Sequence, residues 1–282
     1  MRRPTLGFIF GIGVGACALI APSCGGSLIR DPGPDAAIPD TSSDLGTGDV
    51  VVADLPDVQD VVTGEIAQTG QIVDYSSLKG LVGITVSSGT TQTTTTDTSG
   101  DYTLTVAQNQ PFTMTSGGSG NYATLDEQEW ILGGSANRGP TKLITNSTFN
   151  LLKSLLVPAP DSTLALLFVV VQKTGACAST TGAKLSAPGL TTDGGVGPKL
   201  EYFSGGFPSS IATSVTEGQT PSAILWDLPV GIFSQIIVTP PSGCTLKGFP
   251  ITDPAVPNLT YTGNVKLEGS QTTWSSMRVF LQ

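Results

Sequence analysis

Short segments in which apolar and polar residues alternate recur along the chain, and glycine, proline, serine and threonine gather between them. Alternation with a period of two residues gives a β-strand one apolar face, which packs against a second sheet. Aromatic residues make up only 6% of the sequence, whereas turn-forming residues are abundant. The pattern predicts an all-β protein built from β-sandwiches. The clearest apolar faces are Val82 with Ile84 and Val86, and Tyr102 with Leu104 and Val106.

Residues 91 to 106, TQTTTTDTSGDYTLTV, are expected to form a hairpin. The alternation breaks at Thr98-Ser99-Gly100, where Gly100 supplies the positive φ that a tight turn needs. Asp97 and Asp101 flank the break, but they lack the further oxygen ligands of a calcium-binding loop. We therefore expect these two side chains to cap the turn and to hold no metal.

The order of these elements resembles the carboxypeptidase regulatory-like, or transthyretin-like, β-sandwich domain. In that family a strand ending in V-x-D precedes a G-x-x-V strand, a T-D-x-x-G turn and a strand that begins with an aromatic residue. The matching stretches here are Gly70–Asp74, Gly83–Val86, Thr96–Gly100 and Tyr102–Leu104. The resemblance implies a β-sandwich that serves as an accessory domain rather than as an enzyme.

Two β-sandwich units are predicted, at residues 69 to 137 and, more divergent, at residues 163 to 282. The second unit opens with LALLFVVVQ, an apolar run typical of a buried central strand. Gly182–Ser186 and residues 224 to 238, ILWDLPVGIFSQIIV, resemble the same family more loosely.

A short helix is predicted in the joint between the units, residues 138 to 162. Asn146 or Ser147 caps its start, and Pro158 ends it. A membrane-surface helix would carry more basic residues on its polar face, so we expect this helix to pack against the β-sandwiches. The apolar residues at helical spacing are Phe149, Leu152, Leu155 and Leu156.

Residues 1 to 23 read as a secretory signal peptide: two arginines, an uncharged apolar run and then small residues. The apolar run is shorter than the roughly 20 residues that span a bilayer, which disfavours a transmembrane anchor. A cysteine at the end of such a run resembles the bacterial lipobox, in which the cysteine is acylated. Cys24 is favoured over the alternative, Cys17, because acylation of Cys24 leaves an even pair of cysteines.

The lipobox resemblance implies a palmitate-bearing lipoprotein that is exported and held on a membrane by its lipid. Neither Ala18 nor Gly25 is the aspartate that resembles an inner-membrane retention signal. We therefore expect anchoring in the outer membrane of a Gram-negative-type cell, with the protein facing the periplasm or the outside.

Residues 24 to 68 are expected to form a disordered acidic tether that follows the lipidated cysteine. Nine acidic residues and no lysine or arginine lie between residues 31 and 67. Such a segment buries too little apolar surface to offset its ordering entropy, and its like charges keep it extended. A calcium- or partner-binding tail is the alternative, although the aspartate spacing matches no loop of defined ligand geometry.

Cys177 and Cys244 are the remaining cysteines, and in an exported protein two such residues are expected to form a disulfide. A redox or nucleophilic thiol is disfavoured, because the sequence has neither a C-x-x-C motif nor a histidine partner.

The chain contains no histidine, which removes Ser-His-Asp and Cys-His nucleophile activation and histidine-based metal sites. No cofactor is expected. Nucleic acid is also disfavoured as a partner, because no Lys or Arg cluster follows Arg2-Arg3.

Two functions remain. The favoured one is a non-catalytic envelope lipoprotein that acts as a surface spacer or as an adhesion module for a glycan or a protein. Its loop contacts would be Tyr202, Phe203 and Trp130, although core packing is the simpler role for these side chains. The alternative is a glycoside or peptide hydrolase that uses Glu127 and Glu129. Acids so close in sequence rarely straddle a substrate, so we interpret this segment as a solvated loop.

The lipobox assignment is tested by metabolic labelling with a radioactive fatty acid. We expect Cys24→Ala to abolish the label and Cys17→Ala to retain it, because only the cysteine at the cleavage site is acylated. Loss of the label in Cys17→Ala alone would show that the parity argument selects the wrong cysteine.

Overall fold

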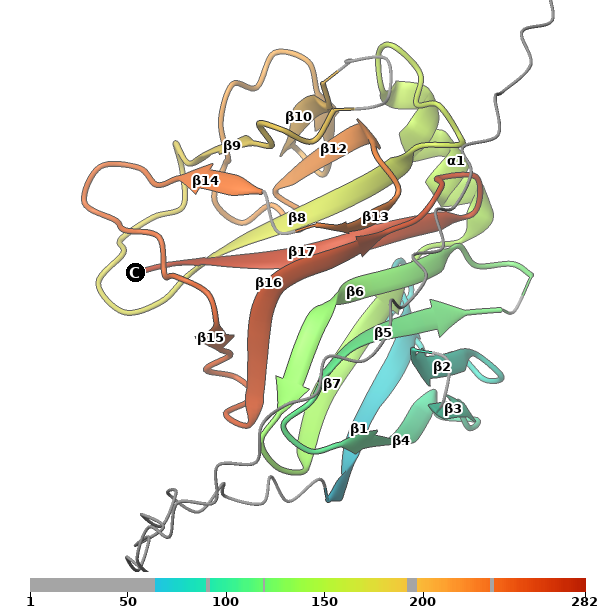
Figure 1. The fold of residues 1–282 in the computed structure, drawn as a ribbon. Helices are drawn as coiled ribbons and strands as arrows, with labels where there is room; N and C mark the ends of the chain where they lie inside the picture. Colours follow the sequence, from blue (N-terminus) through green and yellow to red (C-terminus); the bar gives the residue numbers. More distant parts are fainter. Residues whose placement is uncertain (1–63, 90–91, 119, 192–196, 234–235) are drawn as a thin grey trace, which may run out of the picture. The chain divides into compact units, whose positions relative to one another are not determined.

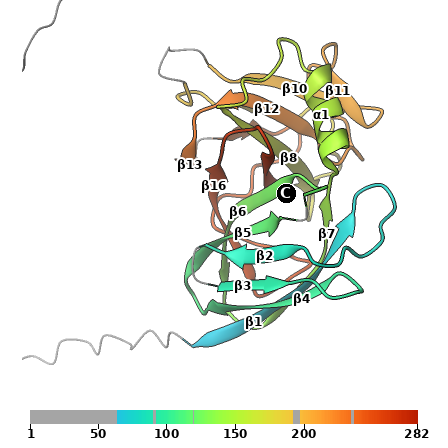
Figure 2. The same ribbon diagram turned by 90° about the vertical axis from the view of Figure 1, so that its right-hand side faces the viewer.

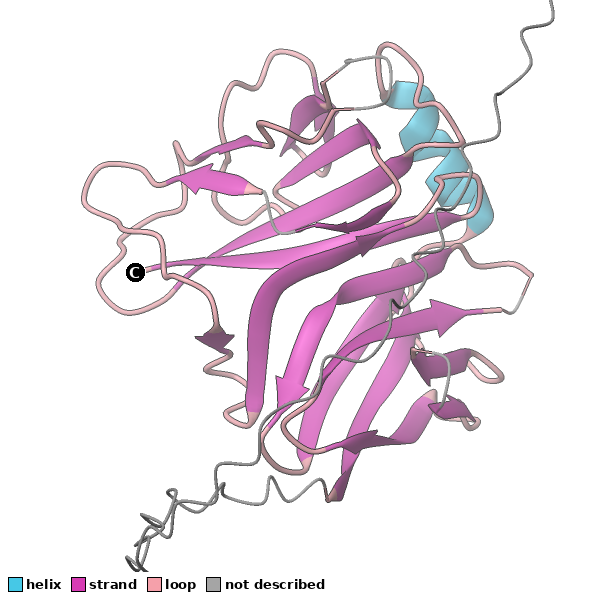
Figure 3. Ribbon diagram, in the orientation of Figure 1, coloured by secondary structure: helices cyan, strands magenta, loops and turns pink. Residues whose placement is uncertain are grey.

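The computed structural model describes residues 64–89, 92–118, 120–191, 197–233 and 236–282. Within these ranges strands predominate and the single α-helix is α1, Asn146–Leu155 (Figure 3). The predicted all-β class is confirmed. Cys17, Cys24 and most of the predicted tether lie outside the described residues. No helix in the described part of the chain is long and apolar enough to cross a membrane.

One 12-stranded sheet contains strands from both predicted sandwiches. Its central strands are β8 (Ala165–Lys173), β17 (Thr273–Leu281) and β6 (Thr124–Leu132), which cross the middle of Figure 1. β17 pairs in parallel with β6 on one edge and with β8 on the other. The path continues from β8 through β12 (Ala223–Leu228) and β10 (Lys199–Ser204) to β11 (Phe207–Ser209), and from β6 through β5 (Pro111–Gly117) and β2 (Thr85–Ser88) to β3 (Gln92–Thr95).

Smaller elements complete the fold around this sheet. β16 pairs with β6 and also with the short strands β13 and β15. A 3-stranded sheet has the order β4-β1-β7, and a 2-stranded sheet joins β14 and β9. Their bounds are β1 Glu65–Asp74, β4 Asp101–Ala107, β7 Ala136–Leu143, β9 Lys184–Ser186, β13 Gly231–Phe233, β14 Ile237–Thr239, β15 Ile251–Thr252 and β16 Leu259–Leu267.

The large sheet is buried on both faces at β8. Leu166 and Phe168 point into one hydrophobic core, which we call the first core. Leu167 and Val169 point into the second core, on the opposite face. A strand that is covered on both faces has no solvent side, which is why β8 is apolar along most of its length. The prediction of a buried central strand at this position is confirmed.

The predicted hairpin at residues 91 to 106 is wrong. β3 pairs with β2 in the large sheet, whereas β4 pairs with β1 in the 3-stranded sheet. The turn at Gly100 therefore carries the chain from one sheet to the other. Its local conformation is as expected, because Gly100 has a φ of 82° and Asp97 Oδ1 accepts the N–H of Ser99 and of Asp101.

Two strand limits also differ from the sequence prediction. Val82 is 63% exposed, because it lies in the turn before β2 rather than on the apolar face of a strand. β1 begins at Glu65, inside the segment assigned to the tether, and Gln68 of this strand is buried.

The predicted helix is confirmed, with a different cap. Thr145 caps α1 in place of Asn146 or Ser147, and its Oγ1 accepts the backbone N–H of the residue three positions on. Phe149 is buried in the first core, whereas Leu155 is exposed. Figure 2 shows α1 beside β10 and β11, so the helix packs on the β-structure, as expected.

The predicted disulfide between Cys177 and Cys244 is present, with an S–S distance of 2.06 Å. Both cysteines contact the second hydrophobic core. The division into units at residues 69 to 137, 138 to 162 and 163 to 282 stays a prediction.

Gly100→Ala is expected to destabilise the protein more than Gly83→Ala. Both glycines have positive φ, so a side chain strains either backbone by about 1 kcal/mol. A Cβ at Gly100 would also lie 2.4 Å from the Ile72 carbonyl oxygen, whereas a Cβ at Gly83 meets no atom within 4 Å. We expect urea denaturation to give an additional loss of about 1–3 kcal/mol for Gly100→Ala. Equal losses would contradict the close packing of this turn.

Candidate functional site

A cavity of about 560 Å³ lies over one face of the large sheet. Its floor is formed by β6, β17, β8 and β10, and its walls by β7, α1 and the loop after β1. Trp130, Trp274, Phe168 and Phe203 line the floor. Phe168 contacts Phe203 and Trp274 edge-on, at centroid distances of 6.0 and 4.8 Å. Aromatic walls of this kind suit the apolar part of a ligand.

Three exposed apolar side chains also line the cavity, and we call them the rim: Tyr75, Leu151 and Phe207. They come from the loop after β1, from α1 and from β11. Their exposed fractions are 39%, 54% and 54%. The apolar interior is therefore continuous with an apolar surface at the opening.

Irregularities in three strands accompany the polar side chains of the site. The register between β6 and β5 shifts where Glu127 and Gln128 lie, and both residues line the cavity. The register between β7 and β1 shifts beside Arg138, where Gly139 has a φ of 71°. The register between β16 and β6 also shifts, just after Tyr261. Such bulges turn side chains away from simple alternation and are frequent beside functional sites.

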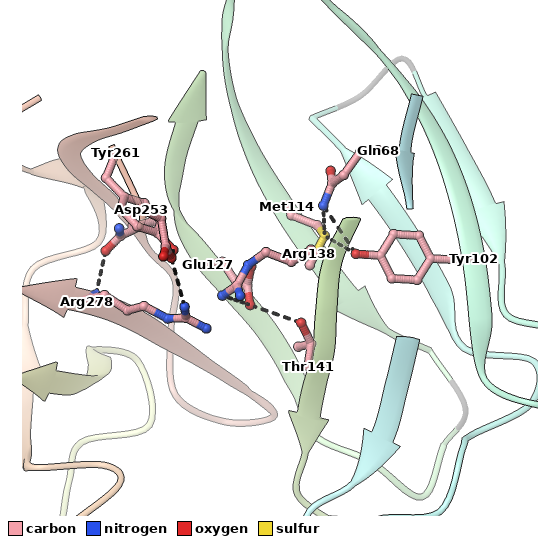
Figure 4. A network of polar contacts seen from close by, with 10 residues as sticks. Gln68, Tyr102, Met114, Glu127, Arg138, Thr141, Asp253, Tyr261 and Arg278 are labelled. Carbon is pink, nitrogen blue, oxygen red and sulfur yellow. Dashed lines mark hydrogen bonds and ion pairs between the residues drawn. The ribbon is translucent and has the colours of Figure 1, made fainter. Parts of the chain in front are cut away.

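Arg138 and Glu127 form a buried ion pair in the cavity (Figure 4). Arg138 Nη2 lies 3.9 Å from Glu127 Oε1, and the side chains are 6% and 9% exposed. The guanidinium group also lies over the Trp130 ring, 5.0 Å from its centroid. Burial alone lowers the pKa of Arg138, but the negative potential of Glu127 and neighbouring groups outweighs it and raises that pKa. The guanidinium group therefore stays charged.

Arg278 of β17 brings a second guanidinium group to the cavity. Its Nη1 lies 3.2 Å from Asp253 Oδ2, which also accepts the Tyr261 hydroxyl at 3.0 Å. The Arg278 backbone N–H donates to Gln128 Oε1 at 2.6 Å. Burial raises the pKa of Tyr261, so its phenol remains a neutral donor. Figure 4 shows this group beside the Arg138 ion pair.

Five buried polar atoms of cavity-lining residues have no hydrogen-bond partner within the described ranges. Buried polar atoms without partners are rare in proteins, and each costs about 1–3 kcal/mol. Their concentration around one cavity marks it as the strongest candidate for a site where water or a ligand supplies the partners. The five atoms are Glu127 Oε2, Gln128 Nε2, Trp130 Nε1, Arg138 Nε and Trp274 Nε1.

The residues predicted as ligand contacts lie on two faces of the large sheet. Trp130 and Phe203 line the cavity. Tyr202 belongs to the second core, and its hydroxyl accepts the backbone N–H of Leu185 at 2.9 Å. Alternation along β10 places Tyr202 and Phe203 on opposite faces.

The interpretation of the segment around Glu127 as a solvated loop is wrong, because the segment belongs to β6. Glu127 is buried in the cavity, whereas Glu129 accepts hydrogen bonds from Thr262 Oγ1 at 2.8 Å and from Asn264 Nδ2 at 2.9 Å. Glu129 does not line the cavity. Glycoside hydrolysis requires two carboxylates that face one substrate space. Glu127 and Glu129 do not meet this requirement.

Sequence reasoning missed Arg138, Arg278 and Trp274. A signal existed for two of them, since alternation along the last strand puts Arg278 on one face with Trp274 and Phe280. A cation in such a row marks a buried polar site. Arg138 gave no comparable signal, because its position depends on the bulge in β7.

A metal centre is not assembled in the described part of the chain. There, no group of three His, Cys, Asp or Glu side chains is placed to hold a metal ion.

Comparison with known proteins gives only distant similarity. No family model and no curated protein matches the chain, so the resemblance to the carboxypeptidase regulatory-like domain stays a prediction. Several solved structures overlap the chain, and the three described here each have a TM-score of 0.21. The minor pilin GBS52 of Streptococcus agalactiae is 10% identical, and the match covers 76% of this chain and 95% of that chain.

The shaft pilin SpaA of Lactobacillus rhamnosus GG is 12% identical, with 78% of this chain and 98% of that chain covered. The TIE protein of Bacillus anthracis is 8% identical, with 77% of this chain and 34% of that chain covered. TM-scores this low do not establish a common fold. These proteins therefore assign the chain neither a family nor a function.

Glu127→Gln is expected to lower the free energy of unfolding by about 3 kcal/mol, because it leaves the buried Arg138 cation without its carboxylate. The double variant Glu127→Gln/Arg138→Met removes both charges and should lose less free energy of unfolding than Glu127→Gln alone. Glu129→Gln is the matched control, since Glu129 bonds to the neutral side chains of Thr262 and Asn264. Urea denaturation measures all three. Similar losses for Glu127→Gln and Glu129→Gln would contradict a stabilising ion pair.

Proposed function

We propose that the chain is a non-catalytic binding protein of the cell envelope and that the aromatic cavity on its large sheet holds the ligand. One observation carries this proposal: aromatic walls and unpartnered buried polar atoms meet in the same cavity. Small-molecule sites combine an apolar enclosure of this size with a few placed polar groups. If the partner is an envelope polysaccharide or protein, the group that enters the cavity is one part of that larger molecule.

A carboxylate-dependent glycoside or peptide hydrolase is the second candidate, and the arrangement of acids disfavours it. Glu127 is the one carboxylate among the described lining residues, and Arg138 already pairs with it. Glycoside hydrolysis uses two carboxylates on either side of the scissile bond. Binding without turnover therefore fits the cavity better.

Placement at the envelope rests on the N-terminal sequence. We propose that a lipid on Cys24, or alternatively on Cys17, anchors the protein in the outer membrane, and that the acidic tether spaces the folded part from it. The Cys177–Cys244 disulfide agrees with export, because disulfides persist in oxidising compartments.

The proposal is tested with anilinonaphthalene sulfonate, a fluorescent apolar anion, and the purified full-length protein. We expect the probe to bind in the cavity and a detergent-free extract of the cell envelope to displace it. Ser276→Trp should weaken probe binding about tenfold or more, because Ser276 lines the cavity floor and an indole would fill that space. Ser186→Trp is the matched control on β9, where the side chain is exposed, and should bind as the wild type does.

Two outcomes would overturn the proposal. Equal probe binding by Ser276→Trp and the wild type would place the ligand outside the cavity. Hydrolysis of a glycan or peptide library that Glu127→Gln abolishes would establish the hydrolase instead.

A further inference from the structure

The unpartnered atoms around the cavity are mostly hydrogen-bond donors. Four of the five donate, and the remaining one, Glu127 Oε2, accepts. The polar side chains around the cavity therefore favour a ligand that offers acceptor lone pairs over one that offers donors. A carboxylate group is such a ligand, because its two oxygens offer about four acceptor sites and no proton. The donors are Gln128 Nε2, Trp130 Nε1, Arg138 Nε and Trp274 Nε1.

The charges of the lining favour an anion. Arg138, Lys142 and Arg278 line the cavity, against the single described acid, Glu127. Glu127 stands 3.9 Å from Arg138, beyond hydrogen-bond length, and Asp253 contacts Nη1 of Arg278. Each guanidinium group has five N–H donors, so both retain donors for a further anion.

Arg138 lies deeper in the site than the rim does. Arg138 is nearly buried, whereas the rim residues Tyr75, Leu151 and Phe207 are exposed. An anionic head would therefore lie at the enclosed end, and the rest of the ligand would pass the aromatic floor towards the rim. A neutral sugar fits the lining less well than an anion does, because it offers no negative charge to Arg138 and Arg278.

We propose that the cavity binds a carboxylate attached to an aliphatic chain, as in a fatty acid. The carboxylate contacts Arg138 and Arg278, and the chain lies on the aromatic floor. This inference rests on the proposed function, because it names the ligand class of the same cavity.

Laurate, dodecanol and dodecylamine test the inference, since they share one chain and differ in the head group. Calorimetric titration of the full-length protein below the micelle concentrations measures each affinity. We expect laurate to bind about tenfold or more tightly than dodecanol, and dodecylamine, a cation at neutral pH, to bind most weakly. These three titrations use the wild-type protein and need no variant to fold.

Arg138→Met should reduce laurate affinity to that of dodecanol and leave dodecanol affinity unchanged. Arg278→Met, at a more exposed position, is the second variant and should reduce the same preference. Lys184→Met is the control, because Lys184 is an exposed residue of β9, and this variant should retain the preference for laurate.

The failures are distinguishable. Equal binding of laurate and dodecanol that Ser276→Trp abolishes would overturn carboxylate recognition and leave the proposed function in place. Stronger binding of an oligosaccharide of uronic acids than of laurate would overturn the proposal that the ligand has an aliphatic chain. Absence of binding by laurate, dodecanol and anilinonaphthalene sulfonate alike would overturn both proposals.

Discussion

The parallel pairing of the C-terminal strand β17 with both β6 and β8 is the constraint on which the rest of the structure depends. Ser275 lies opposite Asp126 on one side and opposite Leu167 on the other. β6 and β8 are separated in the chain by β7 and α1, and β17 is their common neighbour. The cavity floor is therefore continuous only because residues from the end of the chain close the sheet.

The candidate site departs from the rule that buried polar groups are satisfied, whereas the half-buried Asp74 at the end of β1 has a full set of partners. Asp74 Oδ1 accepts the backbone N–H groups of Ser76 and Ser77, and Oδ2 accepts the Tyr122 hydroxyl. The backbone hydrogen bond from Ser77 is the main reason that the pKa of Asp74 is lowered. Within the described ranges, the partners of Arg138 are the Glu127 carboxylate, at 3.9 Å, and the face of the Trp130 ring. Proteins retain departures of this kind at functional sites, where a bound molecule supplies the missing contacts.

How far the sequence predicts the fold depends on the range of the interaction involved. The buried face of β4 follows from alternation, and the buried strand β8 from a continuous apolar run. The helix at α1 follows from helical spacing, and the Cys177–Cys244 pair from cysteine parity. The hairpin at residues 91 to 106 failed because alternation identifies the buried face of a strand, but not its partner strand. β4 presents one buried face and β3 only a half-buried one. They lie in different sheets because β4 pairs with β1 and β3 pairs with β2.

The sequence by itself determined the all-β class, the apolar central strand and the location of the turns, because these depend on contacts between near neighbours. It also placed Trp130 and Phe203 among the candidate contact residues. Only the tertiary structure decided that Glu127 and Glu129 point to different surroundings, and that Arg138 and Arg278 meet over one cavity. The physical reason is that a bulge shifts the side-chain alternation of a strand, and strand pairing joins residues that are far apart in the chain.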